Sequence, residues 1–330
     1  MFQGTVLGPA LWNLFCSDAN RAVRGIGFIE SVFADDVNCW KFMPRDTKEF
    51  DAVLELSACQ AKLHAWGAAN QVLFDASKES FALMRRFHAI GPEFRLLGIT
   101  FDPQLLMHSG SRKIAVAAGW RLQCILRPRR HFNTPELFRL YKSLVLSFIE
   151  SGTPGYFHAA DSVLHCIDRV QHRFLRELSI SEATALVDFR LAPLATRRCM
   201  AILGFLHRIN LGLVSAQIHA MFPKVGARVL AGNGVASRTR AVTASHDKQL
   251  SDPVTSASSE QFKRSIFGMI QCYNALPQRI VDFKTVKLFQ RSLQASVTER
   301  ARQGHEGWQG IFSDGCKYRS LMRFQQLFIV

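Results

Sequence analysis

The chain has 330 residues, of which 48% are hydrophobic and 20% are charged, and this composition excludes an intrinsically disordered protein. The net charge of +15 favours an anionic partner, most commonly nucleic acid, although a basic protein without a polyanionic ligand fits the charge equally well. Apolar runs such as residues 144–149 are too short to cross a bilayer, and the first residues lack the pattern of a secretory signal. We therefore expect an intracellular protein of the nucleus or cytoplasm, with no membrane partner.

The texture of the sequence divides the chain into four regions. Residues 1–110 mix short strand-like runs with helices, and residues 111–225 have an almost wholly helical pattern. Residues 226–260 are rich in Gly, Ser, Thr and Ala, which is typical of a linker. Residues 261–330 return to helical spacing, with Arg and Lys throughout. We predict an α+β fold, in which a region of β-hairpins and helices precedes two mostly helical regions.

The first predicted elements are a helix and a β-hairpin. Pro9 suits the first turn of a helix, because its missing N–H has no partner there in any case. Two strand candidates follow at residues 25–33 and 37–42, both rich in β-branched and aromatic residues. Asp is depleted in strand interiors and common in turns. Asp35 and Asp36, which lie between the two strands, are therefore predicted at the hairpin tip.

Further helices and a second hairpin follow along the chain. Residues 47–70 have the apolar spacing of an amphipathic helix. Strand-like runs at residues 80–84 and 94–101 predict a second hairpin. A Thr-Pro pair at residues 134–135 predicts the N-cap and first turn of another helix, which ends at Gly152.

Asp35 and Asp36 are the residues best suited to carry chemistry. Adjacent carboxylates held between apolar strands concentrate negative charge, which is costly unless a cation is near. Mg²⁺, or Mn²⁺ in its place, prefers such oxygen ligands. In two-metal phosphoryl transfer, the ions activate the attacking oxygen and neutralise charge on the leaving phosphate. The aspartates alone leave open an ordinary exposed turn, because turns attract Asp for local reasons.

Four segments within residues 1–102 resemble the motifs of one polymerase family. Gln-Gly-Thr-Val-Leu-Gly-Pro at 3–9 and Phe-Ala-Asp-Asp at 33–36 are similar to the Q-G-x-x-L-G-P motif and the F/Y-A-D-D hairpin of reverse transcriptase palms. Residues 66–78 resemble the next motif, which carries a lysine, and residues 96–102 resemble the hairpin that grips the primer. All four occur in the family's order and near its spacing, so together they form a specific signal.

The resemblance extends beyond the palm. Residues 140–154, 167–173 and 191–198 resemble the thumb of non-LTR retrotransposon polymerases, and residues 273–289 resemble a segment near the end of such proteins. The resemblance implies that the first of the four regions is a truncated polymerase palm and that the second is a helical thumb.

The resemblance also implies roles for individual residues. Asp35 is expected to be a ligand of the catalytic Mg²⁺, with Asp36 beside it contributing to the field of the ion. Lys78 is expected to approach the triphosphate of the incoming nucleotide, although a surface lysine beside a strand explains it equally well. The template and the incoming nucleotide are expected to contact Gln3, Gly4 and Ala34. The primer end is expected to contact Leu97 and Gly98. A plain strand, with glycine for close approach, explains these last two as well.

Basic residues form two clusters in the thumb-like region. One cluster closes a helix and enters a loop, and the other lies along one side of a helix whose opposite side is apolar. A thumb helix beside a template–primer duplex uses such a stripe to contact phosphates without reading the sequence. A solvated cationic face is the alternative. The clusters are Arg127, Arg129 and Arg130 with His131, and Arg169, Arg173 and Arg176 with His165 and His172.

One departure from the family concerns the metal site. The family's site also uses an aspartate on a strand upstream of the motif at 3–9, and this sequence starts at Met1. We therefore expect the chain by itself to have little polymerase activity and an unpaired sheet edge. Two hypotheses follow. The chain is a partial polymerase unit that takes an RNA template, a DNA primer and deoxynucleoside triphosphates, or it is a non-catalytic, nucleic-acid-binding remnant of a retrotransposon.

Overall fold

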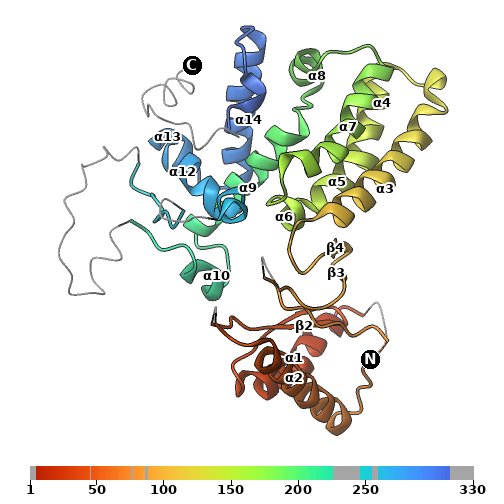
Figure 1. The fold of residues 1–330 in the computed structure, drawn as a ribbon. Helices are drawn as coiled ribbons and strands as arrows, with labels where there is room; N and C mark the ends of the chain where they lie inside the picture. Colours follow the sequence, from red (N-terminus) through yellow and green to blue (C-terminus); the bar gives the residue numbers. More distant parts are fainter. Residues whose placement is uncertain are drawn as a thin grey trace. The chain divides into compact units, whose positions relative to one another are not determined.

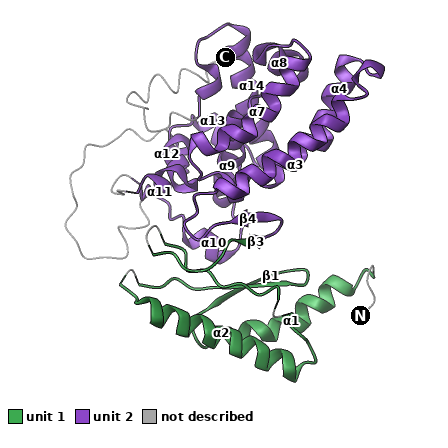
Figure 2. Cartoon of the chain, turned by 45° about the vertical axis from the view of Figure 1, so that its right-hand side comes forward, with its two compact units in different colours: residues 1–94 green, residues 95–330 purple. Residues whose placement is uncertain are grey.

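In the computed structural model the chain forms two compact units, residues 1–94 and residues 95–330 (Figure 2). The structure describes residues 5–44, 46–75, 77–85, 88–225, 246–254 and 259–312. Helices dominate these residues, and the strands form two antiparallel sheets of two strands each, so the coarse α+β prediction is confirmed (Figure 1). No helix in the described ranges is long and apolar enough to cross a membrane. Most of the predicted linker at 226–260 lies outside the described residues.

Unit 1 is a β-hairpin packed against helices. α1 (Gly8–Arg24) has Pro9 in its first turn, where a missing N–H costs nothing. β1 (Ile29–Phe33) pairs with β2 (Asp36–Trp40), and α2 (Glu49–Ala69) follows. α1 contacts both β1 and α2. The predicted helices and the first predicted hairpin are therefore present.

Side chains of the hairpin alternate between a covered and an uncovered face. Phe28 is buried and forms the centre of the core of unit 1 with Val23 and Cys59. Glu30 lies two residues along the same face. Burial raises the pKa of its carboxyl group, against the opposing effect of Arg24. One face of the hairpin therefore supplies the core of this unit.

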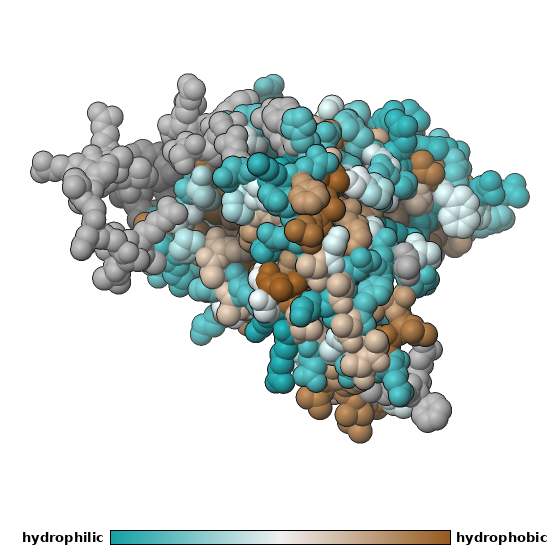
Figure 3. Space-filling model, turned by 60° about the horizontal axis from the view of Figure 1, so that its bottom comes forward, coloured by the Kyte–Doolittle hydropathy of each residue, from teal (hydrophilic) through white to brown (hydrophobic). Residues whose placement is uncertain are grey.

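Unit 1 also leaves apolar side chains uncovered. Leu7, the N-cap of α1, is followed about one turn apart by Leu11 and Leu14, and Leu14 is 71% exposed. Phe50, near the start of α2, is 77% exposed. Figure 3 shows apolar patches that interrupt the hydrophilic surface on the face it presents. Apolar surface of this extent marks a face that another segment or chain can cover.

The first half of unit 2 combines a short hairpin with long helices. β3 (Phe94–Leu96) pairs with β4 (Ile99–Phe101). α3 (His108–Leu126) packs against β4 and along α7 (Asp161–Glu177). Their apolar sides enclose one continuous core.

A long helix of this half contains a π-helical segment. α4 (Thr134–Leu140), the π segment η2 (Tyr141–Leu146) and α5 (Ser147–Ser151) follow one another without a break. The ring of Tyr141 stacks on Phe174 of α7, with ring centroids 4.3 Å apart. The π segment therefore lies against the centre of the core.

The start of this helix differs by one residue from the prediction. Asn133 is the N-cap, and it exchanges hydrogen bonds with Glu136 as a capping box. Thr134, predicted as the N-cap, is the first helical residue. Asn133 is favoured as the N-cap because Glu136, three positions later, accepts a hydrogen bond from the Asn133 backbone N–H. The helix ends at Gly152, as predicted.

The second hairpin differs from the predicted pairing. Among the described residues, the segment 80–84 forms only an isolated bridge, between Leu83 and Ile90. It does not pair as a strand with residues 94–101. The two strands instead form within residues 94–101. Leu97 and Gly98 have φ values of 47° and 85°, and left-handed backbone at both central residues makes a tight hairpin turn.

The second half of unit 2 is built on α9 (Leu194–Asn210) and α14 (Val286–Arg302), which pack along each other. Leu203 of α9 and Leu293 of α14 are fully buried in the same core. The other helices of this half are α8 (Glu182–Phe189), α10 (Ala216–Ala220), α11 (Glu260–Arg264), α12 (Met269–Asn274) and α13 (Gln278–Val281).

A buried ion pair joins the two halves of unit 2. Arg198 of α9 donates hydrogen bonds of 2.5 and 2.9 Å to the two carboxylate oxygens of Asp168 on α7. The side chains are only 6% and 17% exposed. Beside this pair, Gln171 donates to the carbonyl of Ala192 at 3.0 Å. Loss of one partner of such a pair leaves an uncompensated buried charge.

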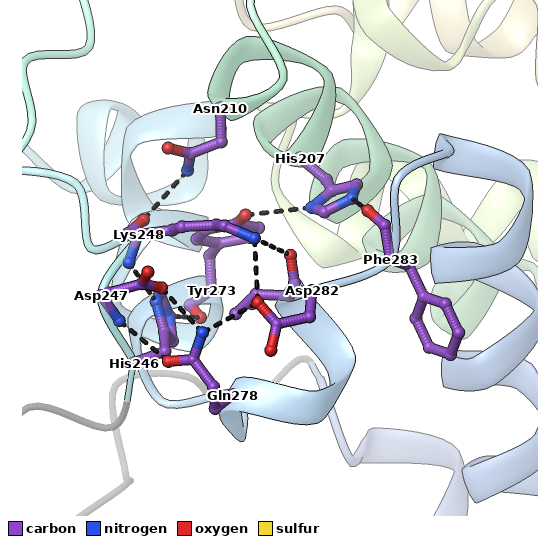
Figure 4. A network of polar contacts seen from close by, with 10 residues as sticks. His207, Asn210, His246, Asp247, Lys248, Tyr273, Gln278, Asp282 and Phe283 are labelled. Atoms are coloured by element: carbon purple, nitrogen blue, oxygen red, sulfur yellow. Dashed lines mark hydrogen bonds and ion pairs between the residues drawn. The ribbon is translucent and has the colours of Figure 1, made fainter.

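Two buried histidines connect the segment 246–254 to the helices around it (Figure 4). His207 Nε2 lies 2.7 Å from the Phe283 carbonyl, and Nδ1 lies 3.1 Å from the Tyr273 hydroxyl. His246 Nε2 lies 3.0 Å from the Tyr273 carbonyl, and Nδ1 accepts from the Lys248 N–H. Because a carbonyl only accepts, both rings carry their hydrogen on Nε2, and both Nδ1 atoms are left as acceptors.

Two glycines of α3 form a matched pair for a test of packing. A Cβ on Gly110 would lie 2.2 Å from the Thr100 carbonyl oxygen, whereas a Cβ on Gly119 meets nothing within 4 Å. We expect Gly110→Ala to lower the free energy of unfolding by about 1–3 kcal/mol, because backbone cannot move aside cheaply. Gly119→Ala should raise it by about 0.5–1 kcal/mol. Urea unfolding followed by circular dichroism measures both, and equal effects would contradict this packing.

The buried histidines make the stability of unit 2 depend on pH. Burial lowers the pKa of His207 and His246 below the ordinary 6.5, although their bonds to backbone carbonyls oppose the shift. The unfolded chain therefore binds more protons, so stability falls as the pH drops from about 6.5 through the lowered pKa values. We expect the thermal midpoint to fall across this window, and to fall less in His207→Gln or His246→Gln. An equal fall of the thermal midpoint in these variants and in the unsubstituted protein would contradict the burial of the two neutral histidines.

Candidate functional site

The hairpin of unit 1 places the two aspartates at its tip, as predicted. Phe33 pairs with Asp36 at the end of the ladder, and Ala34 and Asp35 form a two-residue turn between the strands. Both carboxylates are exposed. Asp36 lies on the face opposite Phe28, because alternate residues of a strand point to opposite sides. The Asp36 carboxylate therefore faces away from the core of unit 1.

The turn holds a backbone conformation that is unfavourable for its residue. Ala34 has a φ of 55°, in the left-handed region, which costs a residue with a Cβ about 1–2 kcal/mol. Trp12 of α1 donates its indole N–H to the Ala34 carbonyl at 2.5 Å. Sequence reasoning missed Trp12, because no local pattern joins it to a turn 22 residues away. A contact from outside the hairpin thus anchors the turn that carries Asp35.

The tip has the ligand chemistry of a site for a hard cation. Mg²⁺ in proteins is commonly held by one or two carboxylates together with phosphate oxygens and water, and Mn²⁺ accepts similar ligands. Among the residues that the structure describes, no group of three His, Cys, Asp or Glu side chains is placed to hold a metal ion. Asp35 and Asp36 could supply two carboxylate ligands to such an ion.

Lys78 makes its contact elsewhere. Its side chain is 83% exposed, and Nζ lies 3.6 Å from the Asp75 carboxylate. No hydrogen bond or ion pair joins Lys78 to Asp35 or Asp36 in the described part of the chain. Gln3 and Gly4, the predicted template and nucleotide contacts, lie outside the described residues.

Leu97 and Gly98, predicted at the primer end, form the turn between β3 and β4 in unit 2. Leu97 is 56% exposed. The hairpin itself is anchored, because Ile99 packs against α6 (Thr153–Tyr156), where a Cβ on Gly155 would lie 2.7 Å from Ile99 Cδ1. The turn at Leu97 is therefore exposed, whereas the strand that follows it is packed against α6.

α7 presents its cationic side outward, as predicted. Its buried side includes Leu164, Ile167, Val170 and Phe174. Arg169 and Arg176 are exposed, and half-buried Arg173 donates to the Gln123 side chain of α3 at 3.0 Å. A groove of about 520 Å³ runs between α3 and α7, and Arg112, Arg169 and Arg173 line it. We call this surface the α3–α7 face.

The second predicted basic cluster lies where α3 ends. Arg127 is the C-cap of α3, and the short helix η1 (Arg129–His131) follows. Arg129 pairs with Glu177 of α7 at 2.7 Å, so this charge is compensated. Arg130, like Arg127, is exposed and has no carboxylate partner among the described residues. Because Glu177 ends α7, the ion pair brings the two basic clusters together.

Sequence reasoning missed a further concentration of cations in unit 2. It lines a cleft bordered by α5, α8, α9, α13 and α14. Its residues come from positions far apart in the sequence, so no local run of charge marks them.

No match to this chain is found among models of protein families, curated proteins or solved structures. The residues and their geometry therefore carry the functional argument.

The left-handed residue of the turn provides a test of the hairpin tip. Ala34→Gly removes the Cβ that disfavours a φ of 55°, at the cost of a more flexible unfolded chain. We expect a net gain of about 0.5 kcal/mol in the local opening free energy, seen as a roughly twofold slowing of hydrogen–deuterium exchange in Ile29–Phe33 and Asp36–Trp40. The control is Ala58→Gly in α2, where φ is not positive and exchange should become faster. Faster exchange in Ala34→Gly would contradict a strained turn.

Proposed function

We propose that this chain is the palm and thumb portion of a retroelement reverse transcriptase, an RNA-directed DNA polymerase. The observation that carries the proposal is the Phe-Ala-Asp-Asp segment at the tip of an antiparallel hairpin, with Asp35 in the turn and Asp36 opening the second strand. This segment lies among three further motifs that resemble the same family in order and spacing.

Asp35 and Asp36 would hold the metal. A bound Mg²⁺ or Mn²⁺ would polarise phosphate oxygens and activate the primer hydroxyl. The chain's own contribution is to keep both carboxylates on an exposed tip, away from the core and within reach of a nucleotide. Trp12 supports this role, because its bond to Ala34 fixes the turn from which Asp35 projects.

Unit 2 supplies a surface suited to a template–primer duplex. Arg169, Arg173 and Arg176 of α7 would contact backbone phosphates without reading the sequence. Trp120 lies on the same stripe of α3 as Arg112, eight residues later, and is 69% exposed. An exposed aromatic ring beside arginines is a stacking platform for an unpaired base at a duplex end.

A second candidate is a nucleic-acid-binding remnant without catalysis. One observation favours it: within the described ranges, no third potential ligand joins Asp35 and Asp36 in a metal-binding group. Catalysis by two ions depends on accurate placement of both, and two neighbouring carboxylates constrain them weakly. We therefore propose that the chain by itself extends primers slowly at best, while retaining duplex binding.

The decisive experiment pairs primer extension with metal binding. We expect Mn²⁺, followed by water-proton relaxation in the presence of an RNA–DNA template–primer and nucleotide, to bind the chain. Asp35→Asn/Asp36→Asn should abolish this binding and any Mg²⁺-dependent extension. Asp46→Asn/Asp51→Asn removes the same charge from exposed positions of unit 1 and serves as the control.

The outcomes separate the two candidates. Extension that requires Asp35 and Asp36 establishes the polymerase. Duplex binding that weakens steeply with salt, without metal binding at the tip, establishes the remnant. In either case Arg169→Gln/Arg173→Gln/Arg176→Gln should lower the slope of log affinity against log salt by about 3, since each duplex phosphate contact contributes about 0.9. If the aspartate variant keeps metal binding and the arginine variant keeps duplex binding, both candidates are contradicted.

A further inference from the structure

A cleft of about 1230 Å³ lies within unit 2, bordered by η2, α5, α8, α9, α13 and α14. Six cationic side chains line it, against two carboxylates, which leaves an excess of four positive charges. The cations are Lys142, Arg190, Arg197, Arg279, Arg291 and Arg302. None of these residues belongs to the hairpin tip or the α3–α7 face.

The two carboxylates of the lining are each already bound. Glu150 accepts from Arg197 at 2.5 Å, and Glu299 accepts from Arg302 at 2.7 Å. Neither carboxylate is therefore free to compensate the other cations. The excess charge belongs to side chains that the protein leaves without an anion.

Arg190, Arg279 and Arg291 are exposed and make no ion pair among the described residues. Lys142 is half-buried and donates to the Phe189 carbonyl, a neutral group. Burial lowers the pKa of Lys142, and the charges of Arg197 and Arg190 lower it further. The cations of the cleft thus repel one another, and an anion entering it would relieve that repulsion.

The shape of the lining suits a chain of phosphates. Arg291, Ala295, Thr298 and Arg302 follow one side of α14 at helical spacing, and they span about 16 Å at 1.5 Å per residue. A row of this length reaches more than one successive phosphate of a nucleic-acid strand. Hydroxyl and amide side chains between the arginines add neutral donors for phosphate and sugar oxygens, and Phe283 adds an aromatic ring.

We propose that this cleft binds the backbone of a single-stranded nucleic acid. Phe283 in the lining offers a ring on which an unpaired base can stack, whereas the bases of a duplex are stacked on one another and are not available to it. Arginine forks bind phosphate oxygens in pairs, and the spaced, unpaired arginines here match a polymer more closely than one compact ion. The proposal goes beyond the polymerase function and does not depend on the metal site.

Fluorescence anisotropy with labelled twelve-residue oligo-dT and oligo-U tests the proposal on the full chain. Arg190→Gln/Arg279→Gln/Arg291→Gln removes three charges that make no internal ion pair, so the fold should be retained. Each single-strand phosphate contact contributes about 0.7 to the salt slope, so the slope should fall by about 2 and the affinity about a hundredfold at 0.1 M salt. The matched control, Lys224→Gln/Lys284→Gln/Lys287→Gln, removes three exposed charges outside the cleft and should have a much smaller effect.

Further measurements distinguish single-strand binding in the cleft from a general effect of charge, from binding of other anions and from binding at the α3–α7 face. Equal losses in the two triple variants would show a general charge effect and overturn the proposal. So would poly-glutamate or dTTP binding as tightly as the oligonucleotide, or loss of single-strand binding in Arg169→Gln/Arg173→Gln/Arg176→Gln to the same extent. Failure to bind a hairpin duplex or to extend a primer counts against the proposed function alone. Single-strand binding that requires Arg190, Arg279 and Arg291 supports the cleft whatever those assays show.

Discussion

The arrangement of helices in unit 2 depends on the buried pair between Arg198 and Asp168. Burial by itself would lower the pKa of Arg198, but its hydrogen bonds to Asp168 outweigh that effect and raise it. The two parallel bonds of a guanidinium fork tolerate little rotation of either partner. α7 and α9 are therefore fixed about their own axes as well as in position, and a desolvated charge penalises any other packing.

This constraint determines which cations reach solvent. On α7, Arg169 follows Asp168 directly, so the residue next to the buried carboxylate points to the α3–α7 face. On α9, Arg197 precedes Arg198 and turns instead to Glu150 and the cleft. One ion pair thus fixes α7 and α9, which contribute arginines to two separate cationic surfaces of unit 2. Each surface includes an arginine that directly neighbours a member of the ion pair in the sequence, so the pair positions both arginines.

The sequence predicted the features that depend on local chemistry. Aspartates between two β-rich runs identified the first hairpin, and the spacing of Ile167 and Phe174 identified the buried side of α7. Predictions failed where adjacent residues offered competing local signals, as with the N-cap at Asn133 and the turn at Leu97. The cleft and the histidine network could not be predicted, because they join residues far apart in the chain and depend on tertiary packing.

The π segment Tyr141–Leu146 has a consequence for the length of its helix. One residue added to or removed from a regular α-helix rotates every later side chain by about 100°. A π turn holds one residue more than an α turn, because its hydrogen bonds span five residues instead of four. Removing one residue from this segment would therefore leave a regular α-helix, with Ile149 still buried and Glu150 still beside Arg197. This helix can absorb a single-codon deletion at the π segment that it could not absorb elsewhere along its length.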